Sequence, residues 1–274
     1  MLYVQQVLYR CGCISCATCS STARLCLISR LLACWCLPCL DFYSMPSTRS
    51  GWLLGFCLAA GWGCYTQTAA AQASAVHPTQ WAAELRAFAR QDSLTPPPTK
   101  PILFYGSSSI RKWESLRQDF PGRAVLNRGF GGSRFPDALY YFDTLVVAHQ
   151  PRQVVLYEGD NDIGSGATAQ EVFQSFRAFE QLMQQRLPKV PLVFLAIKPS
   201  PARWALYPQV QEANHLIREY IQQHPKYLRY VDTATPLLGA NGRPQPQFYV
   251  ADSLHMTPAG YRIWTRVVGK ALKK

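Results

Sequence analysis

The stretch Phe104-Tyr-Gly-Ser-Ser-Ser-Ile110 ends an apolar run abruptly in one glycine and three serines. Residues 101–105 predict a short buried strand, and residues 110–116 predict the first turns of a helix. A serine on such a tight turn lies at the end of a sheet beside the free N–H groups of a helix start, which favours a nucleophile. Serine is also a preferred N-cap residue, and the stretch alone favours this plainer role.

Short apolar runs alternate with amphipathic helical segments throughout residues 75–274. The predicted strands are residues 101–105, 124–127, 153–157, 191–197 and 228–232. These runs are continuously apolar, as expected for parallel strands that are covered on both faces. Helical patterns lie at residues 78–90, at 168–187 after a capping box, from Pro208, and from Thr257 to the C-terminus. The order predicts a three-layer α/β/α sandwich with a five-stranded, flavodoxin-like parallel sheet.

The N-terminal residues differ in composition from this domain, because all ten cysteines precede Tyr65. Two pairs, Cys16 with Cys19 and Cys36 with Cys39, have the spacing of a four-cysteine zinc site. The residues between the pairs are largely apolar, however, where a zinc knuckle is polar and rich in turns. A metal or redox module therefore stays an alternative, and an export signal explains the segment better.

The export signal is predicted at residues 45–73. A short positively charged start precedes the apolar residues 52–62, and small residues suited to signal peptidase follow at 69–73. Residues 1–44 are then an upstream extension from a mis-called start or a disordered leader. The mature domain, residues 75–274, is expected to be periplasmic or secreted, and it contains no cysteine.

The charge of the chain limits its partners. The sequence carries 28 Lys and Arg against 16 Asp and Glu, a formal net charge of +12. The basic residues are scattered rather than clustered, which argues against a nucleic-acid partner. The apolar run at 52–62 is too short for a stable membrane span. Oligomeric state is not readable from the sequence.

Polar clusters follow the predicted strands, where ligands bind in open α/β sheets. The clusters are Gly106-Ser-Ser-Ser109, the glycine-rich turn Asn127-Arg-Gly-Phe-Gly-Gly-Ser133, Glu158-Gly-Asp-Asn-Asp162 and Asp252-Ser-Leu-His255. Each has a plainer role: glycines shape turns, asparagine closes Asx-turns, and an aspartate can simply bond a nearby histidine. Four such clusters at one edge of a sheet favour a shared catalytic site.

These clusters resemble the sequence blocks of the SGNH (GDSL-type) hydrolase superfamily, which supply a serine, a glycine, an asparagine and a histidine. The resemblance spans residues 95–270, and Gly-x-Asn-Asp and Asp-x-x-His are its most specific parts. Ser107 stands where the family has an aspartate, which selects Ser108 as the nucleophile, and Trp113 supports this register over Ser109. The chain is most similar to exported members with a stretch like Lys198-Pro-Ser-Pro-Ala-Arg-Trp204.

The resemblance implies a serine esterase with the SGNH hydrolase fold. Ser108 would attack the ester carbonyl, His255 would move the proton, and Asp252 would fix the imidazole tautomer. The N–H groups of Ser108 and Gly132 and the amide of Asn161 would form the oxyanion hole.

The expected substrate is a small-molecule or glycan ester, with an acetylated carbohydrate suggested by the family and the export signal. Arg128, Arg203 and Trp204 are candidate substrate-binding residues. No cofactor and no metal are expected, because nothing is spaced to join Asp160 and Asp162 as a third ligand. The alternative is a catalytically silent carbohydrate-binding protein on the same fold, although all the catalytic residue types are present.

Overall fold

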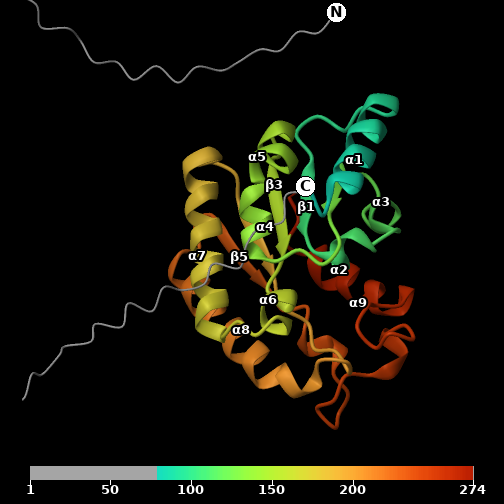
Figure 1. Ribbon diagram of the computed structural model, residues 1–274, viewed down its shortest axis with the longest axis vertical. Coiled ribbons are helices and arrows are strands. Elements are labelled where there is room, and N and C mark those ends of the chain that lie inside the picture. Colours follow the sequence, from blue (N-terminus) through green and yellow to red (C-terminus); the bar gives the residue numbers. More distant parts are fainter. Residues whose placement is uncertain (1–78, 274) are drawn as a thin grey trace, which may run out of the picture. The chain divides into compact units, whose positions relative to one another are not determined.

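The five predicted strands form one parallel sheet in the computed structural model, which describes residues 79–273 (Figure 1). The strands are β1 (Ile102–Gly106), β2 (Val125–Gly129), β3 (Gln153–Tyr157), β4 (Leu192–Leu195) and β5 (Leu228–Val231). Their order is β2-β1-β3-β4-β5, and every neighbouring pair is parallel. The prediction of a three-layer α/β/α sandwich is therefore confirmed.

Helices connect the strands and cover both faces of the sheet (Figure 1). The α-helices are α1 (Ala82–Leu94), α2 (Ser108–Arg111), α3 (Leu116–Asp119), α4 (Phe135–Tyr140), α5 (Phe142–Leu145), α6 (Asp160–Gly164), α7 (Ala169–Arg186), α8 (Tyr207–Gln223) and α9 (Pro258–Val268). Short 3₁₀ helices are η1 (Val147–His149), η2 (Trp204–Leu206), η3 (Thr235–Leu237) and η4 (Pro246–Phe248). The capping box at Thr168 and the Thr257 N-cap lie where the sequence predicts them.

Side chains of successive strand residues enter two separate cores. Leu103 and Tyr105 of β1 pack with α7 and α8, whereas Ile102 and Phe104 pack with α2 and α9. This alternation follows from the period of two along a strand. Because both faces are covered, β1 and β3 are buried at every position. The edge strand β5 differs from the prediction, since Arg229 is exposed.

The helix after the serine turn is shorter than the sequence predicts. α2 ends at Arg111 instead of continuing to Leu116. The Trp113 ring turns into the core beside Phe104, with ring centroids 5.6 Å apart, and its indole N–H donates to Asp119 over 2.6 Å. These contacts of the Trp113 side chain take the place of the next helical turn.

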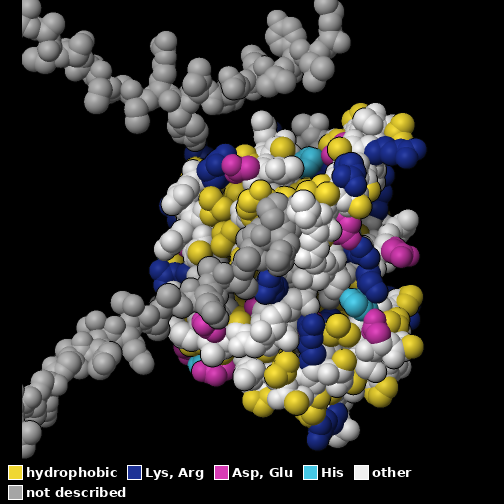
Figure 2. All heavy atoms as spheres, in the orientation of Figure 1, with side chains coloured by type: hydrophobic (Ala, Val, Ile, Leu, Met, Phe, Trp, Pro, Cys, Tyr) yellow, Lys and Arg dark blue, Asp and Glu magenta, His cyan; other side chains and the backbone are white. Residues whose placement is uncertain are grey.

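Two sequence predictions concern surfaces and membranes. On the face shown in Figure 2, Lys and Arg side chains are spread over several parts of the molecule rather than gathered in one patch. Within residues 79–273, no helix is both long and apolar enough to cross a membrane. The predicted zinc-like cysteine pairs and the export signal lie outside the described residues.

Candidate active site

The strand register brings the predicted polar clusters to one edge of the sheet. Gly106, the last residue of β1, pairs with Gly129 at the end of β2 and with Tyr157 at the end of β3. The segments that follow these three residues therefore leave the sheet side by side. These are the serine turn, the glycine-rich turn and the segment that contains Asn161.

The turn after β1 requires a glycine. Gly106 has a φ of +128°, and a Cβ added to it would lie 2.0 Å from the carbonyl oxygen of Tyr157. The backbone N–H of Ser107 donates to the same oxygen over 3.1 Å. This close approach places Ser108 at the first position of α2, where its backbone N–H has no hydrogen-bond partner among the described residues.

Ser108, His255 and Asp252 are joined by hydrogen-bonding groups. The Ser108 Oγ lies 2.9 Å from His255 Nε2, and His255 Nδ1 lies 2.6 Å from Asp252 Oδ2. The carboxylate favours the tautomer with its proton on Nδ1, which leaves the Nε2 lone pair directed at the serine hydroxyl. This arrangement can remove the proton from Ser108 and hold it on the imidazole.

A tight turn holds the acid beside the histidine. Asp252 Oδ1 accepts hydrogen bonds from the backbone N–H groups of Leu254 and His255, both over 2.9 Å, and Ser253 has a φ of +58°. The bond from the His255 side chain, followed by these backbone bonds, holds the pKa of Asp252 well below its usual range. The acid therefore stays ionised at neutral pH.

Gly132 and Asn161 present further donors at this edge. Gly132 has a φ of +75°, and its N–H has no hydrogen-bond partner among the described residues. Asn161 Nδ2 donates one proton to the Ser133 carbonyl over 3.0 Å, which ties the asparagine to the glycine-rich turn. An amide nitrogen carries two protons, so one remains for a ligand.

Asp160 and Arg203 form an ion pair directly beside Asn161. Arg203 Nη1 lies 2.6 Å from Asp160 Oδ1, and its Nη2 donates to Asn161 Oδ1 over 3.0 Å. Lys198 Nζ reaches the other Asp160 oxygen over 2.8 Å. Burial opposes ionisation of Asp160, but the two cations outweigh it and lower the pKa of this carboxyl.

A second group of carboxyls lies beneath the glycine-rich turn. Glu158 is fully buried, and its Oε1 accepts a hydrogen bond from the Ser133 hydroxyl over 2.5 Å. Burial, reinforced by the neighbouring Asp162, raises the pKa of Glu158 well above its ordinary value. Asp162 Oδ1 accepts from the Phe135 N–H over 3.0 Å, and burial raises the pKa of Asp162 to about 6.

The three predicted substrate-binding residues lie in different environments. Arg203 contacts Asn161, as described above. The Arg128 side chain is 1% exposed and is bound to Asp92, and its role in substrate binding stays a prediction. Trp204 stacks on Tyr207, with ring centroids 4.7 Å apart, and the Arg243 guanidinium lies over the Trp204 ring, 4.7 Å from its centroid.

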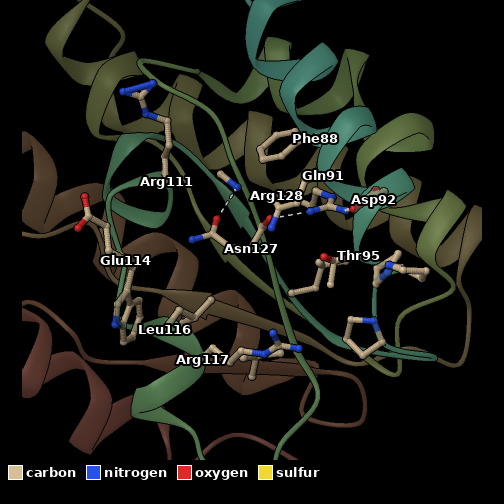
Figure 3. Close-up of a pocket in the computed structure, with 17 residues that line it drawn as sticks. Phe88, Gln91, Asp92, Thr95, Arg111, Glu114, Leu116, Arg117, Asn127 and Arg128 are labelled. Atoms are coloured by element: carbon tan, nitrogen blue, oxygen red, sulfur yellow. Dashed lines mark hydrogen bonds and ion pairs between the residues drawn. The ribbon is translucent and has the colours of Figure 1, made fainter.

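Two hollows are lined in part by Arg111, at the end of α2. One, of about 460 Å³, is lined by His255 together with Arg111, Lys112, Met256 and Tyr261, among others. The other, of about 440 Å³, lies along the outer edge of β2, where Phe88, Asp92 and Arg128 meet (Figure 3). The second is not lined by Ser108, Asn161 or His255, so it is separate from the hydrogen-bonded site.

A metal ion at this edge would need three or more His, Cys, Asp or Glu side chains grouped around it. Within the part of the chain that the structure describes, no three His, Cys, Asp or Glu side chains are grouped to hold a metal ion. The oxygens of Asp160 are bound by Lys198 and Arg203, and Asp162 Oδ1 is bound by the Phe135 N–H.

Sequence reasoning missed the roles of Lys198, Glu158 and Ser133. Glu158 directly follows β3, and Lys198 lies three residues after the end of β4. A buried charged residue so close to a strand is unusual unless it is paired. This position in the sequence was the signal that could have indicated their roles. The partner of Lys198 could not be predicted from the sequence, because Lys198 and Asp160 are separated by 38 positions in the chain.

A five-stranded parallel sheet between helices, with a serine at a strand-to-helix turn, is the fold of the GDSL-type (SGNH) hydrolases. The chain belongs to the GDSL-like lipase/acylhydrolase family, whose model matches residues 92–263. Membership of an acylhydrolase family supports a hydrolase, and the resemblance stated from the sequence is confirmed.

Known proteins similar to this chain agree with the family. Platelet-activating factor acetylhydrolase IB subunit alpha1 of Homo sapiens is 26% identical over 169 residues, which cover 58% of this chain and 70% of that protein. A structure from Bacteroides fragilis, assigned as an acylhydrolase, is 21% identical with a TM-score of 0.60 and covers 69% of this chain and 95% of that one. A GDSL-like lipase from Bacteroides thetaiotaomicron is 21% identical with a TM-score of 0.58, covering 69% and 97%. At these identities the two structures show the fold alone.

Proposed function

We propose that the protein is a serine esterase that hydrolyses small acyl esters with Ser108 as the nucleophile. The observation that carries the proposal is a pair of hydrogen-bond distances. Ser108 Oγ lies 2.9 Å from His255 Nε2, and His255 Nδ1 lies 2.6 Å from Asp252 Oδ2. A hydroxyl is a weak nucleophile unless a positioned base takes its proton, and this arrangement supplies the base and its orienting acid.

The reaction would proceed in two steps. Ser108 Oγ attacks the ester carbonyl carbon while its proton passes to His255 Nε2, which then protonates the departing alkoxide to release the alcohol. Water next attacks the acyl-enzyme and gives its proton to His255, and Ser108 leaves with that proton as the acid is released. Asp252 stays ionised throughout and stabilises the imidazolium.

Negative charge develops on the carbonyl oxygen in both steps. The backbone N–H groups of Ser108 and Gly132 and the second proton of Asn161 Nδ2 would bind this oxyanion. All three donors are held by the fold before substrate binds, and loss of one such donor typically lowers kcat about 10²- to 10³-fold.

The proposed acyl group is acetyl, and the proposed alcohol is a carbohydrate. The human relative is named as an acetylhydrolase, which supports a small acyl group. The carbohydrate part rests on the predicted export of the protein, which we retain as a proposal. The hollow of about 460 Å³ that His255 lines offers space for the alcohol part of an ester beside the proposed base.

Labelling with a fluorophosphonate and peptide mapping test the proposal. The adduct is expected on Ser108, and Ser108→Ala should lose both the adduct and turnover of p-nitrophenyl acetate while its circular dichroism spectrum is retained. Ser93→Ala, at the exposed end of α1, is the control and should keep full activity. Full activity in Ser108→Ala would overturn the assignment. A folded wild-type protein with neither adduct nor turnover would favour the catalytically silent carbohydrate-binding protein.

A further inference from the structure

We propose that Arg203 is a positioning residue for the oxyanion hole and acts through the side-chain amide of Asn161. The inference rests on the proposed function, because Asn161 matters only if a negative charge forms beside it. Arg203 belongs to none of the four sequence blocks that supply the serine, glycine, asparagine and histidine.

The direction of the Asn161 amide is set by its two partners. Arg203 Nη2 donates to Oδ1 over 3.0 Å, and Nδ2 donates to the Ser133 carbonyl over 3.0 Å. A flipped amide would direct its N–H groups at the guanidinium and its oxygen at a carbonyl. Both contacts would then be repulsive, since a guanidinium has no acceptor and a carbonyl has no donor. Arg203 therefore favours the one orientation that directs a proton toward an oxyanion.

Arg203 also polarises the amide. Hydrogen bonds from a charged donor are stronger than those from a neutral donor, and bonds in a chain strengthen one another. A guanidinium that withdraws electron density from Oδ1 makes the Nδ2 protons better donors. The positive charge thus acts on the oxyanion through Asn161 without direct contact.

The guanidinium is itself held rigidly. Its Nη1 donates to the Asp160 backbone oxygen over 2.9 Å as well as to the Asp160 carboxylate. The opposite carboxylate oxygen is fixed by Lys198, whose side chain is 0% exposed. Gly164 packs against the guanidinium, since a Cβ added there would lie 2.8 Å from the Arg203 Cζ. Arg203 is thus locked in the position from which it reaches Asn161.

The loop that carries Arg203 also contacts the turn between Asp252 and His255. The Ala202 N–H donates to the Ser253 carbonyl over 3.0 Å, and the Tyr249 hydroxyl donates to the Pro199 carbonyl over 2.7 Å. Residues 198–204 therefore join the segment that bears the oxyanion donor to the segment that bears the base and its acid.

A double-mutant cycle on turnover of p-nitrophenyl acetate tests whether Arg203 acts through Asn161. The four proteins are the wild type, Asn161→Ala, Arg203→Ala and the double variant. We expect Arg203→Ala to lower kcat by about tenfold or more and to change KM by less than about threefold, since it removes transition-state stabilisation alone. The double variant should match Asn161→Ala within about threefold, because nothing remains to be oriented.

Two further variants separate positioning from folding. Arg203→Lys keeps a positive charge near Asp160, but one ammonium cannot bridge Asp160 and Asn161 as the guanidinium fork does. Its kcat should lie between those of the wild type and Arg203→Ala, and it replaces Arg203→Ala in the cycle if that variant does not fold. Arg186→Ala removes an arginine from the exposed pair with Asp143 and should leave kcat unchanged.

The outcomes distinguish this inference from the proposed function. Full turnover in Ser108→Ala would overturn the proposed function. If Ser108→Ala is inactive, an equal loss of kcat from Arg203→Ala in the presence and absence of Asn161 would overturn the role of Arg203 alone. A rise in KM with unchanged kcat would do the same, because it would make Arg203 a substrate-binding residue.

Discussion

The Ser133 hydroxyl donates to Glu158 Oε1 over 2.5 Å, at a carboxyl that is fully buried. The carbonyl oxygen of the same serine accepts a hydrogen bond from the side-chain amide of Asn161. Ser133 therefore connects a buried acid to a proposed oxyanion donor, one residue after Gly132. Burial raises the pKa of Glu158 and so favours its protonated form, in which the acid is a structural hydrogen-bonding group.

Glu158→Gln is expected to preserve stability and activity at pH 7. A glutamine has the shape of a protonated glutamic acid, and its oxygen can still accept from the Ser133 hydroxyl. Glu158→Ala should cost about 0.5–1.5 kcal/mol from the lost hydrogen bond, with a further loss from the cavity. The Ser133 hydroxyl would keep the Phe130 carbonyl as an acceptor over 3.3 Å. Urea unfolding of the two variants checks this difference, and equal destabilisation of both would show that Glu158 is needed as a charge.

The raised pKa of Asp162 predicts a loss of stability as pH rises. Between its unfolded value near 3.8 and its folded value of about 6, the native state binds more protons than the unfolded state, so the free energy of unfolding falls with increasing pH. This shift in pKa corresponds to a change of about 3 kcal/mol at most in the free energy of unfolding. Asp162→Asn should remove this decline.

Urea unfolding of the wild type and Asp162→Asn from pH 4 to 7 measures the effect. The comparison is between the two slopes, because Asp160 and Asp252 have lowered pKa values and stabilise the protein increasingly as pH rises. Identical slopes would mean that the pKa of Asp162 is the same in the native and unfolded states.

Asp252→Asn should leave the turn intact and abolish most of the turnover. The asparagine oxygen can still accept from the N–H groups of Leu254 and His255, but its amide would donate to Nδ1 and stabilise the wrong tautomer of His255. A loss in kcat of about 10⁴-fold is expected, by analogy with the serine protease case. Steady-state kinetics with p-nitrophenyl acetate provides the measurement, and a loss below tenfold would reduce Asp252 to a local turn residue.

The fold was predictable because its signals are local. Strand candidates 101–105 and 153–157 are short, apolar and bounded by turn residues, and the caps at Thr168 and Thr257 mark helix starts with specific side chains. Parallel topology then follows from alternation of strands and helices. The end of α2 was missed because it depends on Trp113 packing against Phe104, a contact that no local pattern records.

The candidate site also contains residues that the sequence predicted and contacts that it did not. Ser108, Asn161, Asp252 and His255 follow strands or precede a helix, and a resemblance in short blocks identifies them. The partners of Asp160 and Glu158 are set by which strand ends are adjacent in the sheet. The partner of Arg128 could not be predicted either, because Asp92 lies on α1, 36 positions away in the chain.

The ion pair between Arg128 and Asp92 predicts that loss of Asp92 lowers the stability of the fold and leaves substrate binding unchanged. Arg128 is 1% exposed and pairs with Asp92, and its Nε donates to His149 over 3.1 Å. Asp92→Ala would leave the buried guanidinium without its anion, which costs about 3 kcal/mol or more. Asp143→Ala is the matched control, since its exposed pair with Arg186 contributes about 0–1 kcal/mol.

Thermal unfolding and steady-state kinetics of the two variants distinguish the roles open to Arg128. For a structural ion pair, Asp92→Ala should lower Tm well below that of Asp143→Ala, while KM for p-nitrophenyl acetate at a temperature where both are folded stays unchanged. For a substrate-binding arginine, loss of the partner would instead free the guanidinium and alter KM at constant Tm. Since all three nitrogens of the Arg128 guanidinium already donate, to Asp92, His149 and the Asn127 carbonyl, the first result is expected.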